Sequence, residues 1–240
     1  IPRFCDHPLL APVAAAADAS SASDAELAAA LPASAAQFKT GENTYRIGAP
    51  KAGGSSTGTV PAGLESFYSQ KIEFSKANCE AMGKEASRAV CGYAIVPVDY
   101  SKPNGATIAV AVVKVPAKGT NASPVFFNPG GPGGSGVDLV KSVSRLFSSD
   151  LLRSYDVVGF DPRGVGQSTA INCLTDSETD AMRASNEGAS LAKGITEKCS
   201  KKTKPAALLD HVDTPSAAKD LDILRQLSGD SKLNYLGYSY

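Results

Sequence analysis

Two short segments contain the residues whose types and spacing could do chemistry. The first is residues 128–136, with the sequence NPGGPGGSG, which follows a short apolar run typical of a strand. Consecutive glycines allow backbone N–H groups to point into a cavity without obstruction, beside a helix N-terminus that favours negative charge. Such a turn can act as an oxyanion hole, in which an N–H group stabilises the charge on a carbonyl oxygen under attack.

The second segment is Gly237-Tyr238-Ser239-Tyr240, which also follows an apolar run. It matches the first four positions of the G-x-S-x-G motif. In that motif a strained turn between a strand and a helix raises a serine hydroxyl above the sheet, and the N–H of the next residue completes the oxyanion hole. The segment is a weak signal alone, but it gains specificity beside the upstream glycine-rich turn.

A dinucleotide site is an alternative for the first segment. Gly131, Gly133 and Gly136 satisfy G-x-G-x-x-G, and Asp161 ends the next predicted strand, where an acidic residue would meet the ribose. Pro132 argues against this alternative because it removes an N–H donor from the turn that would hold the phosphates. A third interpretation is a turn that only reverses the chain.

A further turn, residues 161–168 (DPRGVGQS), is interpreted as structural. Asp161 and Arg163 are expected to brace this loop through a charged hydrogen bond, and no chemical step is assigned to it. His211, one of only two histidines, precedes the Gly-Tyr-Ser segment and is expected to lie in a surface loop.

Strands and helices that must position these turns alternate along the chain. Apolar and β-branched runs predict strands at residues 94–99, 107–115, 124–128, 155–160 and 232–236. Helical spacing predicts helices at residues 137–147 and 215–227, the second capped by Thr214. The expected fold class is therefore α/β, with a mostly parallel sheet that opens with an antiparallel pair and is incomplete at its C-terminal side. Residues 170–209 are polar without clear periodicity and are expected to form an excursion at the rim of the sheet.

Composition excludes several classes of protein. The chain has 24 basic and 24 acidic residues, which argues against nucleic acid as a partner. Hydrophobic residues make up 42% of the chain, which is enough for a core. No apolar stretch is long enough to span a membrane. Residues 1–65, rich in Ala, Ser and Gly, are predicted to be a tail or propeptide with a short helix near residues 24–31, and residues 66–240 a domain.

The five cysteines indicate disulfides and hence an oxidising compartment. They include no C-x-x-C pair and have almost no histidine nearby, so a zinc site is not expected. Short spacing favours the pairs Cys79–Cys91 and Cys173–Cys199, which leaves Cys5 without a partner, although four cysteines allow three connectivities. Together with the sequon at Asn121, this favours a secreted, extracellular protein.

Five stretches resemble the N-terminal part of an α/β-hydrolase of the tripeptidyl aminopeptidase type, related to prolyl aminopeptidases. They are residues 91–100, 127–136, 155–166, 213–225 and 233–240. The resemblance covers roughly residues 79–240 in the family's order. The glycine-rich turn and the Gly-Tyr-Ser segment are its most specific parts.

The resemblance implies an exported enzyme that releases short peptides from the N-terminus of peptide substrates. Ser239 would be the nucleophile, and the N–H groups of Gly131 and Tyr240 would form the oxyanion hole. In this family's order the Asp and His of the triad follow the serine, so both are expected beyond this chain, which would be inactive alone and could associate with its missing C-terminal part. No cofactor or metal is implied. A carboxylester hydrolase of the same fold, or an inert fragment or binding module, are the alternatives.

Overall fold

The structure is a computed structural model that describes residues 59–79, 87–120, 122–184 and 188–239. The expected helix near residues 24–31, most of the predicted tail, and Cys5 and Asn121 lie outside the described residues. The division of the chain at residue 65 stays a prediction.

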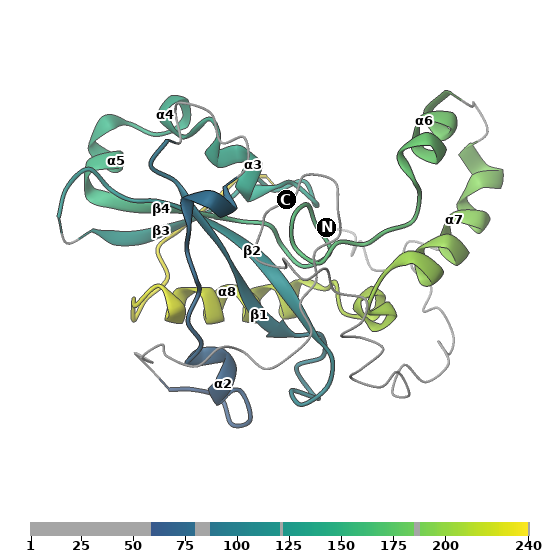
Figure 1. Ribbon diagram of the computed structural model, residues 1–240, viewed down its shortest axis with the longest axis horizontal. Coiled ribbons are helices and arrows are strands. Elements are labelled where there is room, and N and C mark those ends of the chain that lie inside the picture. The colour runs from purple at the N-terminus through teal and green to yellow at the C-terminus, as the bar shows by residue number, and fades with distance from the viewer. Residues whose placement is uncertain (1–58, 80–86, 121, 185–187, 240) are drawn as a thin grey trace.

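Five strands form one sheet in the order β1-β2-β4-β3-β5 (Figure 1). The strands are β1 (Val90–Pro97), β2 (Thr107–Val115), β3 (Ser123–Asn128), β4 (Tyr155–Phe160) and β5 (Tyr235–Gly237). β2 pairs antiparallel with both β1 and β4, whereas β3 pairs parallel with β4 and β5. Four strands therefore point the same way and β2 runs opposite. The predicted α/β class, with its antiparallel opening pair, is confirmed.

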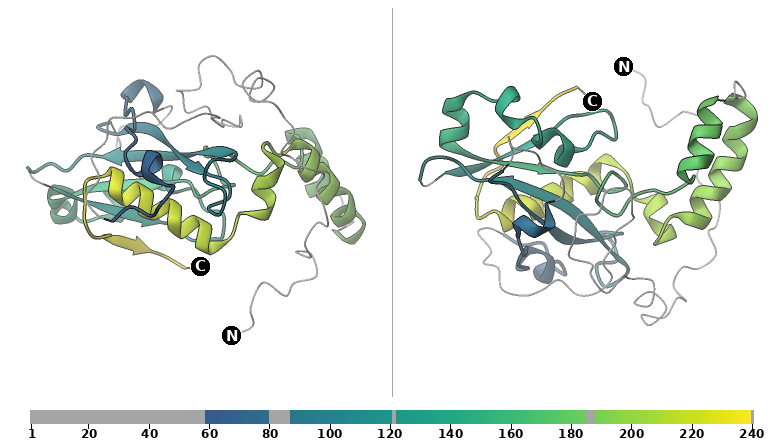
Figure 2. Two further views of the ribbon diagram at one scale, coloured as in Figure 1. Left: turned by 90° about the horizontal axis from the view of Figure 1, so that it is seen from below. Right: turned by 45° about the horizontal axis from the view of Figure 1, so that its top comes forward.

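Both faces of the central sheet are covered. Every residue of β2 except Lys114 is buried, so burial does not alternate along the strand as it would if one face met water. Helices α3 (Gly136–Val140) and α5 (Ser149–Ser154) pack against β4. Helix α8 (Thr214–Leu227) packs against β1 and α2 (Glu65–Tyr68), as Figure 2 shows from two further directions.

A pair of glycines allows α3 to begin directly on β4. A Cβ atom on Gly136 would lie 2.3 Å from the Phe160 carbonyl oxygen, and one on Gly159 would lie 2.4 Å from the Gly136 carbonyl oxygen. The backbone of the helix start therefore touches the backbone of the strand. This contact places the end of the glycine-rich turn at the carboxyl end of β4.

Two predicted helices differ from the observed ones. The helix expected over residues 137–147 is broken into α3 and α4 (Val143–Leu146), because the Lys141 amide bonds to the Asp138 carbonyl in a tight turn. The cap of α8 is Asp213, not Thr214, since the Asp213 carboxylate accepts the Ser216 amide.

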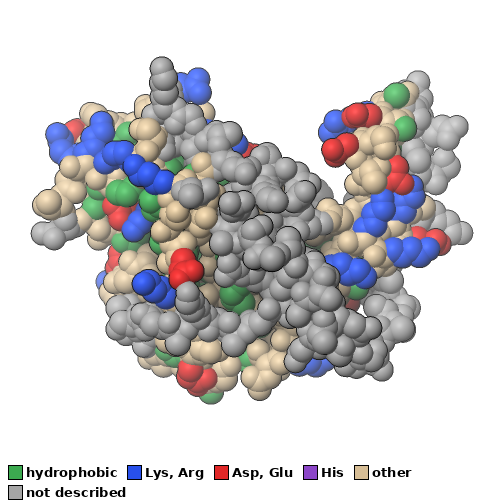
Figure 3. Space-filling model, viewed as in Figure 1, with side chains coloured by type: hydrophobic (Ala, Val, Ile, Leu, Met, Phe, Trp, Pro, Cys, Tyr) green, Lys and Arg blue, Asp and Glu red, His purple; other side chains and the backbone are tan. Residues whose placement is uncertain are grey.

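The largest departure from prediction is a helical hairpin within residues 170–209. It comprises α6 (Asp176–Ala184) and α7 (Gly188–Lys202), followed by the 3₁₀ helix η5 (Ala206–Asp210). No residue of α6 is buried, so its sequence lacks the apolar stripe by which helices are recognised. Figures 1 and 3 show the hairpin projecting from the body, with acidic and basic side chains on its surface.

Both predicted disulfides are present: Cys79–Cys91 joins β1 to the segment before it, and Cys173–Cys199 fastens α7 to the loop before α6. Within the described ranges, no helix is long and apolar enough to cross a membrane.

Candidate active site

The two chemically interesting segments begin side by side. Asn128 ends β3 and is paired with Gly237 at the end of β5. The Tyr238 amide donates a hydrogen bond of 3.0 Å to the Asn128 carbonyl oxygen. Because the strands are parallel, the glycine-rich turn and the serine leave the sheet at the same edge.

Ser239 adopts a backbone conformation that is rare for its residue type. Its φ is 56°, and it is the one non-glycine residue with positive φ in the described part of the chain. A non-glycine residue in this region carries strain, and such residues cluster at functional sites. The serine is exposed, and the ring of the preceding Tyr238 packs edge-on against Phe127, with centroids 5.2 Å apart.

Glycine is required along the first turn. Gly130, Gly131 and Gly133 have φ values of 83°, 129° and 92°. The Gly130 amide donates to the Asn128 side-chain oxygen at 2.9 Å, and the Gly134 amide donates to the Gly130 carbonyl oxygen at 3.0 Å. Gly131 is exposed, and its amide donates to no group among the described residues. Tyr240, expected to supply the second N–H, lies outside those residues.

The Asp161 carboxyl group cannot reach a ribose. It is 0% exposed and accepts hydrogen bonds from the Ser135 hydroxyl at 2.6 Å, the Val137 amide at 3.1 Å and the Gln167 amide at 2.7 Å. Burial raises the pKa of this carboxyl group, while the three hydrogen bonds act in the opposite direction. The acidic residue that the dinucleotide alternative requires is therefore engaged in fastening loops together.

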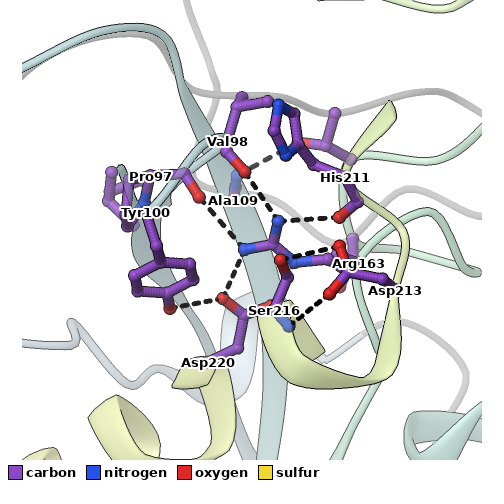
Figure 4. Close-up of polar contacts among 12 residues, drawn as sticks. Pro97, Val98, Tyr100, Ala109, Arg163, His211, Asp213, Ser216 and Asp220 are labelled. Carbon is purple, nitrogen blue, oxygen red and sulfur yellow. Dashed lines mark hydrogen bonds and ion pairs between the residues drawn. The ribbon is translucent and has the colours of Figure 1, made fainter. Parts of the chain in front are cut away.

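Arg163 does not pair with Asp161 as expected, but with Asp220 of α8. Its Nε and Nη2 each lie 2.7 Å from one oxygen of the Asp220 carboxylate, and both side chains are almost fully buried. The remaining donors reach the carbonyl oxygens of Pro97, Val98 and His211 (Figure 4). The burial of Asp220 could not be predicted from the sequence, because a charged residue in a helix usually faces solvent.

Tyr100 completes this buried network by donating a hydrogen bond of 2.7 Å to Asp220. Burial and the adjacent Asp220 carboxylate raise the pKa of the Tyr100 hydroxyl well above its usual value. The network joins the carboxyl ends of β1 and β4 to α8. It therefore supports the rim of the sheet, by which we mean the edge formed by the carboxyl ends of the parallel strands.

His211 lies near the opposite edge of the sheet from Ser239. Its Nε2 is 3.8 Å from an Asp99 carboxylate oxygen, just beyond β1, and β1 and β5 are the two edge strands. His211 directly follows η5 and precedes α8, so it lies in the loop before α8, as predicted. Among the described residues, no group of three or more His, Cys, Asp or Glu could hold a metal ion.

Comparison with known proteins agrees with this geometry. Residues 123–240 match the family described as the alpha/beta hydrolase fold. That segment contains β3, the glycine-rich turn, β4, α8 and the turn at Ser239. The fold is that of an α/β-hydrolase.

The chain is similar to several proteins that are named as peptidases or as an esterase. The chain is 41% identical to "Serine protease Hip1" of Mycobacterium tuberculosis over 163 residues, which is 63% of this chain and 31% of that protein. It is 39% identical to "Tripeptidyl aminopeptidase" of Streptomyces lividans over 165 residues, 62% and 30% of the two chains. "Carboxylesterase B" of Mycobacterium tuberculosis is 41% identical over 153 residues, 59% of this chain and 29% of the relative. The match therefore spans less than a third of each relative's length.

Proposed function

We propose that this protein is a serine hydrolase of the aminopeptidase type, with Ser239 as the nucleophile and the N–H groups of Gly131 and Tyr240 as the oxyanion hole. The observation that supports it is the positive φ of Ser239 at the end of β5, beside a glycine-rich turn with an exposed amide. A strained serine at the carboxyl end of a strand is the arrangement that the G-x-S-x-G motif requires.

The proposed reaction begins with attack of the Ser239 hydroxyl oxygen on a substrate carbonyl carbon. The serine proton passes to a histidine base oriented by a carboxylate, both assigned to residues outside this sequence. The carbonyl oxygen becomes negatively charged beside the Gly131 amide. Collapse of the intermediate breaks the C–N bond, the histidine gives its proton to the departing amine, and the acyl group stays on Ser239. Water then releases the acyl group by the same steps.

Peptides with a free N-terminus are the proposed substrates, because two relatives have the printed names of a serine protease and a tripeptidyl aminopeptidase. An ester substrate is the second candidate, since a relative of equal identity is named a carboxylesterase. The same nucleophile and oxyanion hole can cleave both bonds. The two disulfides support export into an oxidising compartment.

The test uses the protein as its natural host makes it. We expect a fluorophosphonate probe to label Ser239, and a tripeptide chromogen with a free amine to be hydrolysed faster than its N-acetylated form or a short-chain p-nitrophenyl ester. Ser239→Ala should abolish labelling and turnover. Ser231→Ala, which removes another exposed serine just before β5, is the matched control and should retain both.

Three results would contradict parts of the proposal. Turnover that survives Ser239→Ala would exclude Ser239 as the nucleophile. Faster hydrolysis of the ester would favour the esterase alternative. Equal rates on the free and acetylated tripeptides would exclude recognition of the N-terminus.

A further inference from the structure

Asp161 is a fully buried ionisable group that the proposed chemistry does not use. Its side chain lies at the carboxyl end of β4, with Oδ1 accepting from Ser135 and Val137 and Oδ2 accepting from Gln167. Burying an ionisable group is costly unless hydrogen bonds compensate it. Moving any of the three donors away would leave the buried carboxyl group without compensation, so their positions are strongly restrained.

Two of these donors belong to the segment that ends the glycine-rich turn. Ser135 is the last residue before α3, and its hydroxyl oxygen also accepts the Asp138 amide at 2.9 Å. Val137 lies in the first turn of α3. Through these contacts Asp161 fastens the exit of the turn to the sheet.

The loop after β4 wraps closely around the carboxyl group. A Cβ atom on Gly166 would lie 2.2 Å from Oδ2, so only glycine leaves room for the carboxyl group there. The Ser168 hydroxyl, also fully buried, donates to the Asp161 carbonyl oxygen. With both its side chain and its backbone held, Asp161 is a fixed anchor.

Between its two ends the glycine-rich turn has few side chains to hold it. Its entrance is fixed by Asn128, whose side chain accepts the Gly130 amide, and its exit by the link from Ser135 to Asp161. Apart from prolines, the intervening residues are glycines, which have more backbone freedom than any other residue type. Together with the hydrogen bond from the Gly134 amide to the Gly130 carbonyl oxygen, these two anchors set the direction of the Gly131 amide.

We propose that Asp161 is a positioning residue that acts through Ser135 to hold the Gly131 amide where it stabilises the oxyanion. This inference rests on the proposed function. It assigns Asp161 a role in the rate of the chemical step and not only in the stability of the loop.

The test compares three variants with a matched control, in the whole protein. Ser135→Ala removes the donor, Ser135→Thr keeps a hydroxyl, and Asp161→Asn places an amide group where two oxygens are needed. The control is Thr169→Val in the same loop, which removes a buried hydroxyl that accepts the Ala109 amide; the hydrogen bonds of Thr169 go to Ala109 and Gly164, outside the glycine-rich turn. For each variant, kcat, KM, the unfolding midpoint and the rate constant of fluorophosphonate labelling at Ser239 are measured.

We expect Ser135→Ala and Asp161→Asn to lower kcat and the labelling rate constant by about 10- to 100-fold with little change in KM, as misplacement of a catalytic group by about 1 Å would do. Ser135→Thr should recover most of the loss. Thr169→Val should lose stability and keep its kcat.

A kcat for Ser135→Ala equal to that of the unmodified protein, or an equal fall in Thr169→Val, would overturn the inference. These results do not depend on whether Asp161→Asn folds. Absence of labelling in the unmodified protein would overturn the proposed function as well, so the two failures are distinguishable.

Discussion

The rim of the sheet and the α6–α7 hairpin are adjacent in the sequence but are held by opposite means. At the rim, buried charged groups are satisfied by protein partners: Arg163 by Asp220 and three carbonyl oxygens, and Asp161 by three donors. The hairpin has no buried residue in α6. It is fastened by Cys173–Cys199 and by ion pairs from Glu178 to Lys198 and Lys202.

The difference teaches where this fold needs fixed geometry. A buried, fully bonded charge strongly disfavours any rearrangement, because moving its partners leaves a charge without compensation. Exposed ion pairs oppose such a rearrangement only weakly, since water and salt can replace them. The rim, where the proposed nucleophile and the glycine-rich turn leave the sheet, is supported by buried, fully bonded groups.

Replacing Arg163 by Met should give the largest effect. The Asp220 carboxylate would remain buried without its partner, which typically costs about 3–5 kcal/mol of unfolding free energy. Urea unfolding of the protein measures this. The double variant Arg163→Met with Asp220→Leu should recover part of the loss, and a single variant as stable as the unmodified protein would contradict the role of this pair.

Replacing Cys173 and Cys199 by Ser should affect the hairpin more than the sheet. The disulfide closes a loop with a sequence separation of 26, and a loop of this size corresponds to about 3.5 kcal/mol of chain entropy. Hydrogen exchange should show faster exchange in α6 and α7 while β2 and β4 keep their protection. Equal loss of protection in the sheet would show that the two regions are not independently held.

Two glycine substitutions, one in the sheet and one in the hairpin, should change the free energy of unfolding by smaller amounts. Gly159→Ala would place a methyl group 2.4 Å from the Gly136 carbonyl oxygen, and such overpacking typically costs about 1–3 kcal/mol. Gly194→Ala in α7 meets nothing within 4 Å and should stabilise its helix by about 0.5–1 kcal/mol. Unfolding free energies measure both, and a stabilising Gly159→Ala would contradict the close contact between α3 and β4.

The smallest effect is expected from Glu178→Gln. Hydrogen bonds from Lys198 and then Lys202 hold the pKa of Glu178 well below its usual range. A lowered folded pKa means that the stabilisation is present above the ordinary glutamate pKa of about 4.3 and is lost as the pH falls toward the folded value. Protection factors of α6 should fall slightly at pH 7 and become similar to those of the unmodified protein in acid.

Asp180→Asn, which removes a 3.8 Å pair with Arg183 on the same helix, is the control and should change protection less than Glu178→Gln. A loss of protection in the sheet on Glu178→Gln would show that this ion pair supports more than the hairpin.

The sequence by itself determined the features that arise from neighbours along the chain. The β-branched runs gave β2 and β4 with their observed bounds, because strand preference and burial act on the same residues. The NPGGPGG turn and Gly237-Tyr238-Ser239 were recognisable because glycine is needed where the backbone turns sharply. Close cysteine spacing predicted the two disulfides that form.

Only the tertiary structure decided which distant groups meet. Arg163 pairs with Asp220, 57 residues away, and Asp161 binds Ser135, 26 residues away, because the parallel sheet brings its turns to one rim. The α6–α7 hairpin escaped prediction because an exposed helix held by a disulfide needs no apolar stripe. Local preference defined the elements, whereas burial decided the partners of each charge, since only a packed interior makes an unpaired charge costly.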